Sequence, residues 1–109
     1  MLNQESCVPC KGGIEPLSQS ESERLLTYTN AWKLSKDSKF ITKKFTFSNF
    51  KKALNFVNEV GNIAEAEKHH PDLELGWGYV NIKIQTHAID GLHKNDFILA
   101  AKIDEIKLP

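Results

Sequence analysis

Apolar residues repeat at helical spacing in three segments of the chain. The clearest segment forms one buried stripe, whose members follow one another at steps of three or four: Phe50, Ala53, Leu54, Val57, Val60 and Ala64. Ser48 occupies the expected N-cap position of this helix, and Pro71 ends it by about residue 69. Shorter helices are predicted over residues 18–30, which open with capping-box spacing, and from about Asn95 onward.

Between the helices the apolar residues alternate, which is typical of strands. The strand segments are 32–34 and 40–47 before the long helix and 72–89 after it, with a bend at Gly76 and Gly78. Hairpin connections make the strands antiparallel. We therefore predict an α+β domain of order α-β-β-α-β-β-α, with three helices on one face of an antiparallel sheet. The sheet has four strands if residues before the bend form a strand of their own.

Length and composition fit one small domain. Of the 109 residues, 40% are hydrophobic, and 14 Lys and Arg balance 14 Asp and Glu. The zero net charge argues against a strongly basic nucleic-acid module. No apolar run approaches the roughly 20 residues that span a bilayer, and the first residues do not resemble a secretory signal. We therefore expect a cytoplasmic protein with no nucleic-acid or membrane partner.

The first residues differ from the rest of the chain. Residues 1–16 contain both cysteines and lack apolar periodicity, so we expect a flexible N-terminal tail before a domain that covers residues 17–109. Cys7 and Cys10 form a single Cys-x-x-Cys pair, whereas a zinc ribbon needs two such pairs. We expect the pair to have no chemical role, with metal or redox behaviour as the open alternative. Removal of residues 1–12 should then leave the activity unchanged.

Three of the four histidines occupy positions that suit chemistry. His69 and His70 end the long helix, and Glu65 lies one turn before His69 on the same helix face, where a carboxylate favours a protonated imidazole. His87 lies on the polar face of its strand. Because the bend turns this strand back, with residue 83 opposite Pro71, His87 should reach the same end of the sheet as the other two. Clustered imidazoles suit general acid–base catalysis.

The candidate residues also have explanations without chemistry. Glu65 and His69 could be a solvated surface pair, with His70 as a helix cap. Asp96, in the first turn of the last helix, complements the helix dipole, and Trp32 fits the core as well as it fits an aromatic wall for a flat ligand. A zinc site is a competitor, but adjacent histidines on a helix diverge by about 100° and suit chelation of one ion poorly.

Several of these positions form one combined pattern along the chain: Glu65, His69, His70, Pro71, Trp77, Thr86, His87 and Asp96. The pattern resembles that of the pterin-4a-carbinolamine dehydratase family, which has an acidic or polar residue, His-His-Pro, an aromatic residue, Thr-His and a later Asp in this order. The resemblance extends from about Leu17 to Ile106. Each piece alone is weak, but the combination is specific.

The resemblance implies an activity and a setting for it. The expected enzyme is a hydro-lyase that converts 4a-hydroxytetrahydropterin into quinonoid dihydropterin, in the recycling of tetrahydrobiopterin for aromatic amino-acid hydroxylases. It implies a homodimer or homotetramer that needs no metal and no organic cofactor. The functional partner would be an aromatic amino-acid hydroxylase.

The resemblance also implies roles for the candidate residues. His69 and His87 would be the acid–base pair and His70 would mainly bind and orient the pterin, because one proton must reach the leaving oxygen while another leaves a ring nitrogen. Which of the two histidines is the acid stays open. The expected substrate-binding residues are Glu65, Asp96 and Trp32. Glu65 would orient His69, Asp96 would support the site, and Trp32 would adjoin the ring.

A function of another class is the alternative. Some members of the family are binding proteins that act as a dimerisation cofactor for a homeodomain transcription factor, and so as a transcriptional coactivator. That role would use an exposed helix face or sheet edge and would not need the histidines. The intact histidine set therefore favours the enzyme.

Overall fold

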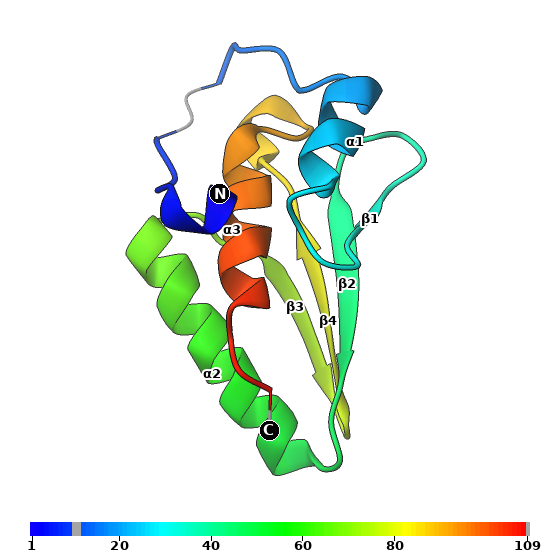
Figure 1. Cartoon of the computed structure of the whole chain (residues 1–109), viewed down its shortest axis with the longest axis vertical. Coiled ribbons are helices and arrows are strands. Elements are labelled where there is room, and N and C mark those ends of the chain that lie inside the picture. Colours follow the sequence, from blue (N-terminus) through cyan, green and yellow to red (C-terminus); the bar gives the residue numbers. More distant parts are fainter. Residues whose placement is uncertain (10–11, 109) are drawn as a thin grey trace.

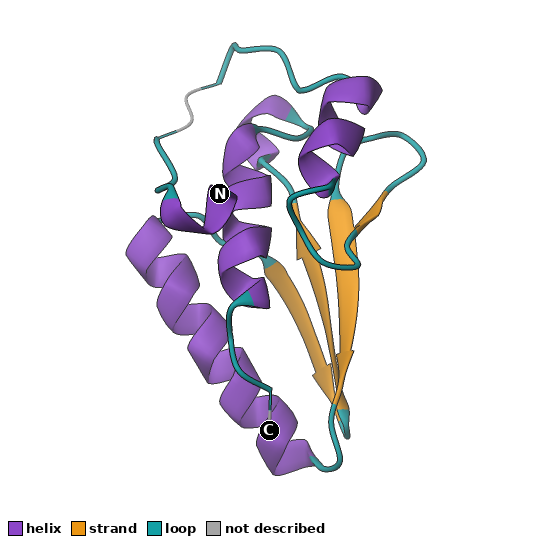
Figure 2. Ribbon diagram, in the orientation of Figure 1, coloured by secondary structure: helices purple, strands orange, loops and turns teal. Residues whose placement is uncertain are grey.

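The computed structural model describes residues 1–9 and 12–108 and has the predicted α+β architecture. Its helices and strands, in chain order, are α1 (Gln19–Leu26), β1 (Lys33–Leu34), β2 (Ile41–Thr46), α2 (Phe50–Glu67), β3 (Asp72–Gly76), β4 (Tyr79–Ile84) and α3 (Lys94–Asp104). Two one-turn 3-10 helices, η1 (Leu2–Gln4) and η2 (His87–Ile89), are added to these. The three α-helices lie on one face of the sheet (Figures 1 and 2). Among the described residues, no helix combines the length and apolar character that a membrane crossing requires.

The sheet brings the two ends of the β3–β4 hairpin together. Its strand order is β1-β2-β4-β3, with every neighbouring pair antiparallel. Asp72 at the start of β3 pairs with Lys83 near the end of β4, one residue away from the predicted register. The residues just before β3 and just after β4 therefore lie at the same end of the sheet. This confirms the expectation that His87 is at the same end as His69 and His70.

Helix α2 is confirmed, but both of its ends differ from the prediction. The N-cap is Asn49 and not Ser48, because the Asn49 side chain accepts a hydrogen bond from the Lys52 N–H at 2.8 Å. Phe50 is exposed and lies outside the buried stripe. At the other end, Lys68 adopts a left-handed conformation with φ 55°, which ends the helix at Glu67. His69 therefore lies outside the helix.

Helix α3 is the most buried of the helices, and its burial extends to polar residues at its start. It lies against η1, α1 and α2. The residues of α3 that are buried are Asn95, Asp96, Phe97, Ile98, Leu99, Ala100, Ala101 and Ile103. Because a buried polar group costs free energy unless it is hydrogen-bonded, Asn95 and Asp96 must find partners in other segments. Those partners form the site described below.

The N-terminal segment, defined here as residues 1–9, lies along α3 (Figure 1). Leu2 is buried in the main hydrophobic core, and Glu5 forms an ion pair with Lys94 at 2.7 Å. Cys10, the second cysteine of the predicted pair, is outside the described residues. The flexibility expected for residues 1–16 stays a prediction, but these contacts show that the segment has partners that periodicity did not indicate.

Candidate active site

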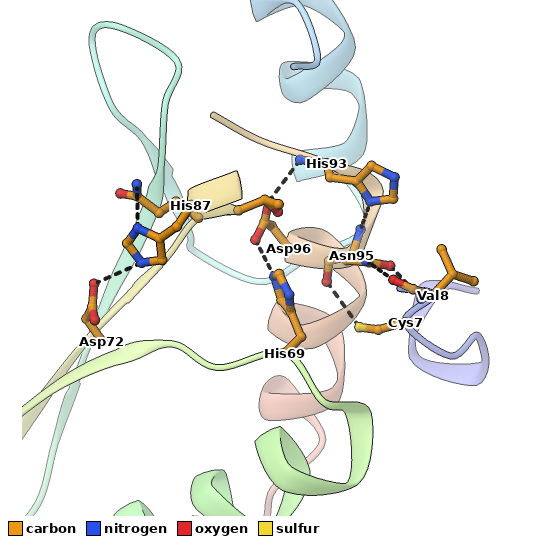
Figure 3. Close-up of polar contacts among 10 residues, drawn as sticks. Cys7, Val8, His69, Asp72, His87, His93, Asn95 and Asp96 are labelled. Carbon is orange, nitrogen blue, oxygen red and sulfur yellow. Dashed lines mark hydrogen bonds and ion pairs between the residues drawn. The ribbon is translucent and has the colours of Figure 1, made fainter. Parts of the chain in front are cut away.

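His69 is positioned by the end of α2 and by α3. Its backbone N–H donates to the Ala64 carbonyl at 3.2 Å, which is part of the helix C-cap. Its side chain is only 13% exposed, and its Nε2 lies 2.6 Å from Oδ1 of Asp96 (Figure 3). A residue that follows one helix is thus held by a carboxylate at the start of another.

Asp96 is fully buried and has three partners. Besides His69, it accepts hydrogen bonds at Oδ2 from the Thr86 hydroxyl at 2.8 Å and from the His93 backbone N–H at 2.9 Å. The last contact belongs to a capping box in which His93 is the N-cap and Asp96 is the third helical residue. The predicted complementarity with the helix dipole and the contact to His69 therefore coexist in one carboxylate.

The Asp96 contact bears on the tautomer of His69, because it engages Nε2 and leaves Nδ1 as the other ring nitrogen. An ionised carboxylate only accepts hydrogen bonds, so when Asp96 is ionised the proton in this pair belongs to Nε2 of His69. The proton-free nitrogen of a neutral His69 is then Nδ1. A carboxylate that fixes the tautomer and the ring orientation in this way is a common means of preparing a histidine for proton transfer.

The predicted pairing of Glu65 with His69 is wrong. Because Lys68 ends the helix, His69 leaves the helical path, and the one-turn spacing no longer places it beside Glu65. The Glu65 carboxylate instead contacts Nε2 of His70, and both side chains are exposed. His69 takes its carboxylate partner from Asp96.

His87 lies in η2 and not in a strand, because β4 ends at Ile84. Its side chain is exposed, with Nδ1 3.3 Å from Nε2 of Gln85 and Nε2 4.0 Å from a carboxylate oxygen of Asp72 (Figure 3). The adjacent Thr86 is buried and binds Asp96. The Thr-His pair therefore has one residue that supports His69 from the inside and one that is free to meet a ligand.

One groove of about 490 Å³ contains all three candidate histidines. Its lining residues are Cys7, Val8, Pro9, Glu67, Lys68, His69, His70, Gln85, Thr86, His87 and Ala88. This volume is within the range of about 300–1,000 Å³ that is usual for small-molecule sites. A larger hollow of about 630 Å³ lies over the strands, but among the described residues that line it there is no histidine. The first groove, which we call the histidine groove, is therefore the candidate site.

Trp32 is not brought to the histidine groove. It is buried in the main core, and its indole N–H donates to Oδ1 of Asp104 at 2.9 Å. Of the predicted substrate-binding residues, Asp96 lies behind His69 and Glu65 reaches His70 from outside. The sequence did not indicate the remaining lining residues, which are residues 7–9, Glu67, Lys68, Gln85 and Ala88.

Cys7 and Glu67 influence each other at the edge of the groove. The Cys7 backbone N–H donates to Oε1 of Glu67 at 2.8 Å. This hydrogen bond, followed by the Lys102 ammonium group, lowers the pKa of the Glu67 carboxyl below its usual value. Burial, and after it the negative charge of Glu67, raise the pKa of the Cys7 thiol to about 12. The thiol is therefore neutral near pH 7. Within residues 1–9 and 12–108, no three His, Cys, Asp or Glu side chains gather as a metal site would require.

The fold and the groove define an α+β domain with an aspartate-supported histidine site. Residues 15–106 match the family model described as Pterin 4 alpha carbinolamine dehydratase. The chain belongs to this family, and the resemblance noted from its histidine pattern is confirmed.

Relatives of known name agree with this family. A protein of Halorhodospira halophila is 50% identical over 105 residues, which are 96% of each chain. A protein of Methylococcus capsulatus is 49% identical over 105 residues, which cover 96% of this chain and 92% of the relative. Both are named, provisionally, as pterin-4-alpha-carbinolamine dehydratases.

Solved structures have the same fold. The transcriptional coactivator/pterin dehydratase of Brucella melitensis has a TM-score of 0.76 and 27% identity, over 82% of this chain and 95% of its own. A pterin dehydratase-like protein, described as a RuBisCO assembly factor in the alpha-carboxysome, has a TM-score of 0.59 and 20% identity, over 71% of this chain and 89% of its own. The second likeness concerns the fold alone.

Proposed function

We propose that the protein dehydrates 4a-hydroxytetrahydropterin to quinonoid dihydropterin by histidine acid–base catalysis. The observation that carries the proposal is the histidine groove, in which His69, held by the buried Asp96, shares one lining with His70 and His87. Membership of the dehydratase family supplies the substrate class.

The reaction needs two proton transfers and no nucleophile. The C4a–O bond breaks as a proton reaches the leaving oxygen, the ring N–H loses its proton, and a C=N bond forms with release of water. One of His69 and His87 would donate the first proton and the other would accept the second, while His70 would orient the ring. A positioned acid or base contributes about 10²–10⁴-fold each, so two histidines suffice for substantial acceleration.

The setting that we propose follows from the family. The enzyme would be a cytoplasmic hydro-lyase that needs no metal or organic cofactor, and it would return the pterin that an aromatic amino-acid hydroxylase releases. A homodimer or homotetramer is part of the proposal. The exposure of His87 agrees with a site that is shallow or shared with a neighbouring subunit.

The test is the decay of freshly generated 4a-hydroxytetrahydropterin, followed by ultraviolet absorbance. Wild type should accelerate the decay, and His69→Ala and His87→Ala should each lower turnover by at least about tenfold. His93→Asn is the matched control, because it removes the fourth imidazole and keeps an N-cap side chain. Near-wild-type turnover in both groove variants would contradict the assigned roles.

The second candidate is a binding role like that in the name of the Brucella melitensis neighbour. Trp77, in the turn between β3 and β4, is 71% exposed and so offers an apolar contact away from the core. If folded wild type does not accelerate the decay, this role as a dimerisation cofactor or coactivator becomes the better explanation.

A further inference from the structure

The N-terminal segment is anchored on α3 before it reaches the histidine groove. The buried Leu2 side chain fixes it in the core, and the Asn3 side-chain amide donates to Glu105 just past the end of α3. Glu5 then pairs with Lys94 at the start of the helix. The segment thus follows α3 back toward its N-terminal end, where Asp96 holds His69.

Asn95 fixes the next residues through their backbone. Its buried side chain accepts a hydrogen bond from the Val8 N–H at 3.0 Å and donates one to the Val8 carbonyl at 2.6 Å (Figure 3). The amide pairs with one residue in both directions, as a neighbouring strand would. The Cys7 N–H donates to Glu67 at 2.8 Å, and its thiol donates to the Asn95 carbonyl at 3.5 Å.

The residues that hold this segment are next to the residues that hold the histidine. Glu67 is the last residue of α2, just before the turn to His69, and Asn95 immediately precedes Asp96 in α3. In the view of Figure 3, Cys7 and Val8 lie on one side of His69 and His87 on the other. The end of α2 and the start of α3 therefore each hold residues 7–8 at one side of the groove and also position His69.

We propose that residues 7–9 form a wall of the pterin site, with Asn95 and Glu67 as its positioning residues. The identity of the ligand rests on the proposed function, whereas the wall rests on the contacts above. Val8 is 57% exposed at the groove, so its apolar surface and that of Pro9 are available to a flat ring. Burial of that surface against the ligand would stabilise the complex. This proposal contradicts the expectation that removal of residues 1–12 leaves the activity unchanged.

KM and kcat distinguish a residue that only contacts the ligand from a residue that transfers a proton. An apolar contact is made equally in the substrate complex and in the transition state, so its loss raises KM and leaves kcat unchanged. Val8→Ser and Asn95→Ala should each raise KM about fivefold, with kcat within about twofold of wild type. Ile14→Ser is the matched control, because Ile14 is 47% exposed in the same N-terminal region and lies outside the groove lining.

The double variant tests whether Asn95 acts through the wall. If it does, Val8→Ser combined with Asn95→Ala should raise KM less than the product of the single effects. A loss of stability alone would lower the active fraction and so kcat, without a change of KM. An unchanged KM in both folded single variants would overturn the proposal.

Thiol protection tests the wall without the reaction. In a Cys10→Ser background, Cys7 is the remaining cysteine, and its alkylation at pH 9 should be slowed at least about threefold by saturating 7,8-dihydrobiopterin, a stable reduced pterin. A cysteine placed by Ile14→Cys in a chain without Cys7 and Cys10 should show no protection. Protection without dehydration would retain the wall and reject the proposed function. Dehydration without protection and without KM effects would reject the wall alone. The absence of both dehydration and protection would reject the wall and the proposed function.

Discussion

The buried Asp96 carboxylate lies 2.6 Å from Nε2 of His69, and its other oxygen accepts the Thr86 hydroxyl and the His93 N–H. The two carboxylate oxygens of Asp96 therefore have different structural functions. Oδ2 closes the capping box of α3 and ties the end of the β3–β4 hairpin to it, whereas Oδ1 orients an imidazole in the groove. Removal of the whole side chain would disturb both, so a test of the catalytic part must keep the cap.

Asp96→Asn keeps the cap and changes the histidine. The two donors at Oδ2 would draw the amide oxygen of Asn to that side, which leaves the NH₂ group facing His69. Nε2 of His69 must then accept, and its proton moves to Nδ1, the nitrogen that should be free. We expect turnover of 4a-hydroxytetrahydropterin to fall by at least about tenfold, as the loss of one acid–base group would cause.

Thermal unfolding supplies the control for Asp96→Asn. Its cap is retained, so the melting temperature should fall by only a few degrees, in line with about 1 kcal/mol. Wild-type turnover in the folded variant would show that the Asp96 contact does not set the reactive tautomer.

Glu65→Gln should have a small effect. The Glu65 carboxylate pairs with His70 in water-exposed surroundings, and exposed pairs contribute about 0–1 kcal/mol. Both kcat and KM should stay within about threefold of wild type in the dehydration assay. A loss as large as that expected for Asp96→Asn would mean that Glu65 reaches the reacting atoms, as the helical spacing suggested.

Helical and strand periods predicted the element order, but not the contacts that make the site. The spacing of Glu65 and His69 predicts one shared helix face, but the left-handed conformation of Lys68 ends the helix before His69. Lysine has no marked preference for this conformation, so the local sequence does not predict that the helix ends at Glu67. The pairing of His69 with Asp96 spans 27 residues and depends on how α2 and α3 pack.

The N-terminal segment shows a second limit of periodicity. A single buried residue, Leu2, anchors it, and its later contacts are made by backbone groups of Cys7 and Val8. Neither leaves a repeating pattern. The structure shows that Asn95 is buried at the start of α3 and therefore needs a partner, but the sequence does not indicate this burial.

The hydrogen bond from the Cys7 N–H to Glu67 should weaken at low pH. The pKa of Glu67 is lowered by the Cys7 N–H and by Lys102, so the contact stabilises the fold above the ordinary glutamate value of 4.5 and is lost as pH falls through the lower folded value. Protonated Glu67 is a weaker acceptor. Amide hydrogen exchange at Cys7, corrected for the intrinsic pH dependence, should therefore be protected near pH 6 and lose protection as the pH falls through the lowered pKa of Glu67.

Glu67→Gln gives the comparison for the acid effect. The variant lacks the ionisable group, so protection of the Cys7 amide should be weaker near pH 6 and nearly independent of pH. Asp37 carries another lowered carboxyl pKa, caused by the Ser35 hydroxyl and the Lys39 N–H in an exposed turn, and Asp37→Asn should leave exchange at Cys7 unchanged. Equal acid loss in wild type and Glu67→Gln would assign the effect to another group.

Asp104 should contribute more to stability than Asp90, which forms the other Lys–Asp ion pair among the described residues. It accepts hydrogen bonds from the Asn30 N–H at 2.8 Å and the Trp32 indole at 2.9 Å, and it pairs with Lys43 at 2.8 Å. The side chains of Lys43 and Asp104 are each 12% exposed, whereas those of Lys39 and Asp90, which pair at 2.7 Å, are 47% and 74% exposed.

Asp104→Asn removes the charge that Lys43 faces and turns an NH₂ group toward one of the other donors. We expect it to lower the free energy of unfolding by about 2 kcal/mol. Asp90→Asn, at a position where Asn also tolerates positive φ, should cost no more than about 0.5 kcal/mol. Urea unfolding measures both, and since Asp104 lies away from the histidine groove, dehydration per folded molecule should be unchanged. Equal losses in the two variants would show that burial of the Asp104 cluster adds nothing to its strength.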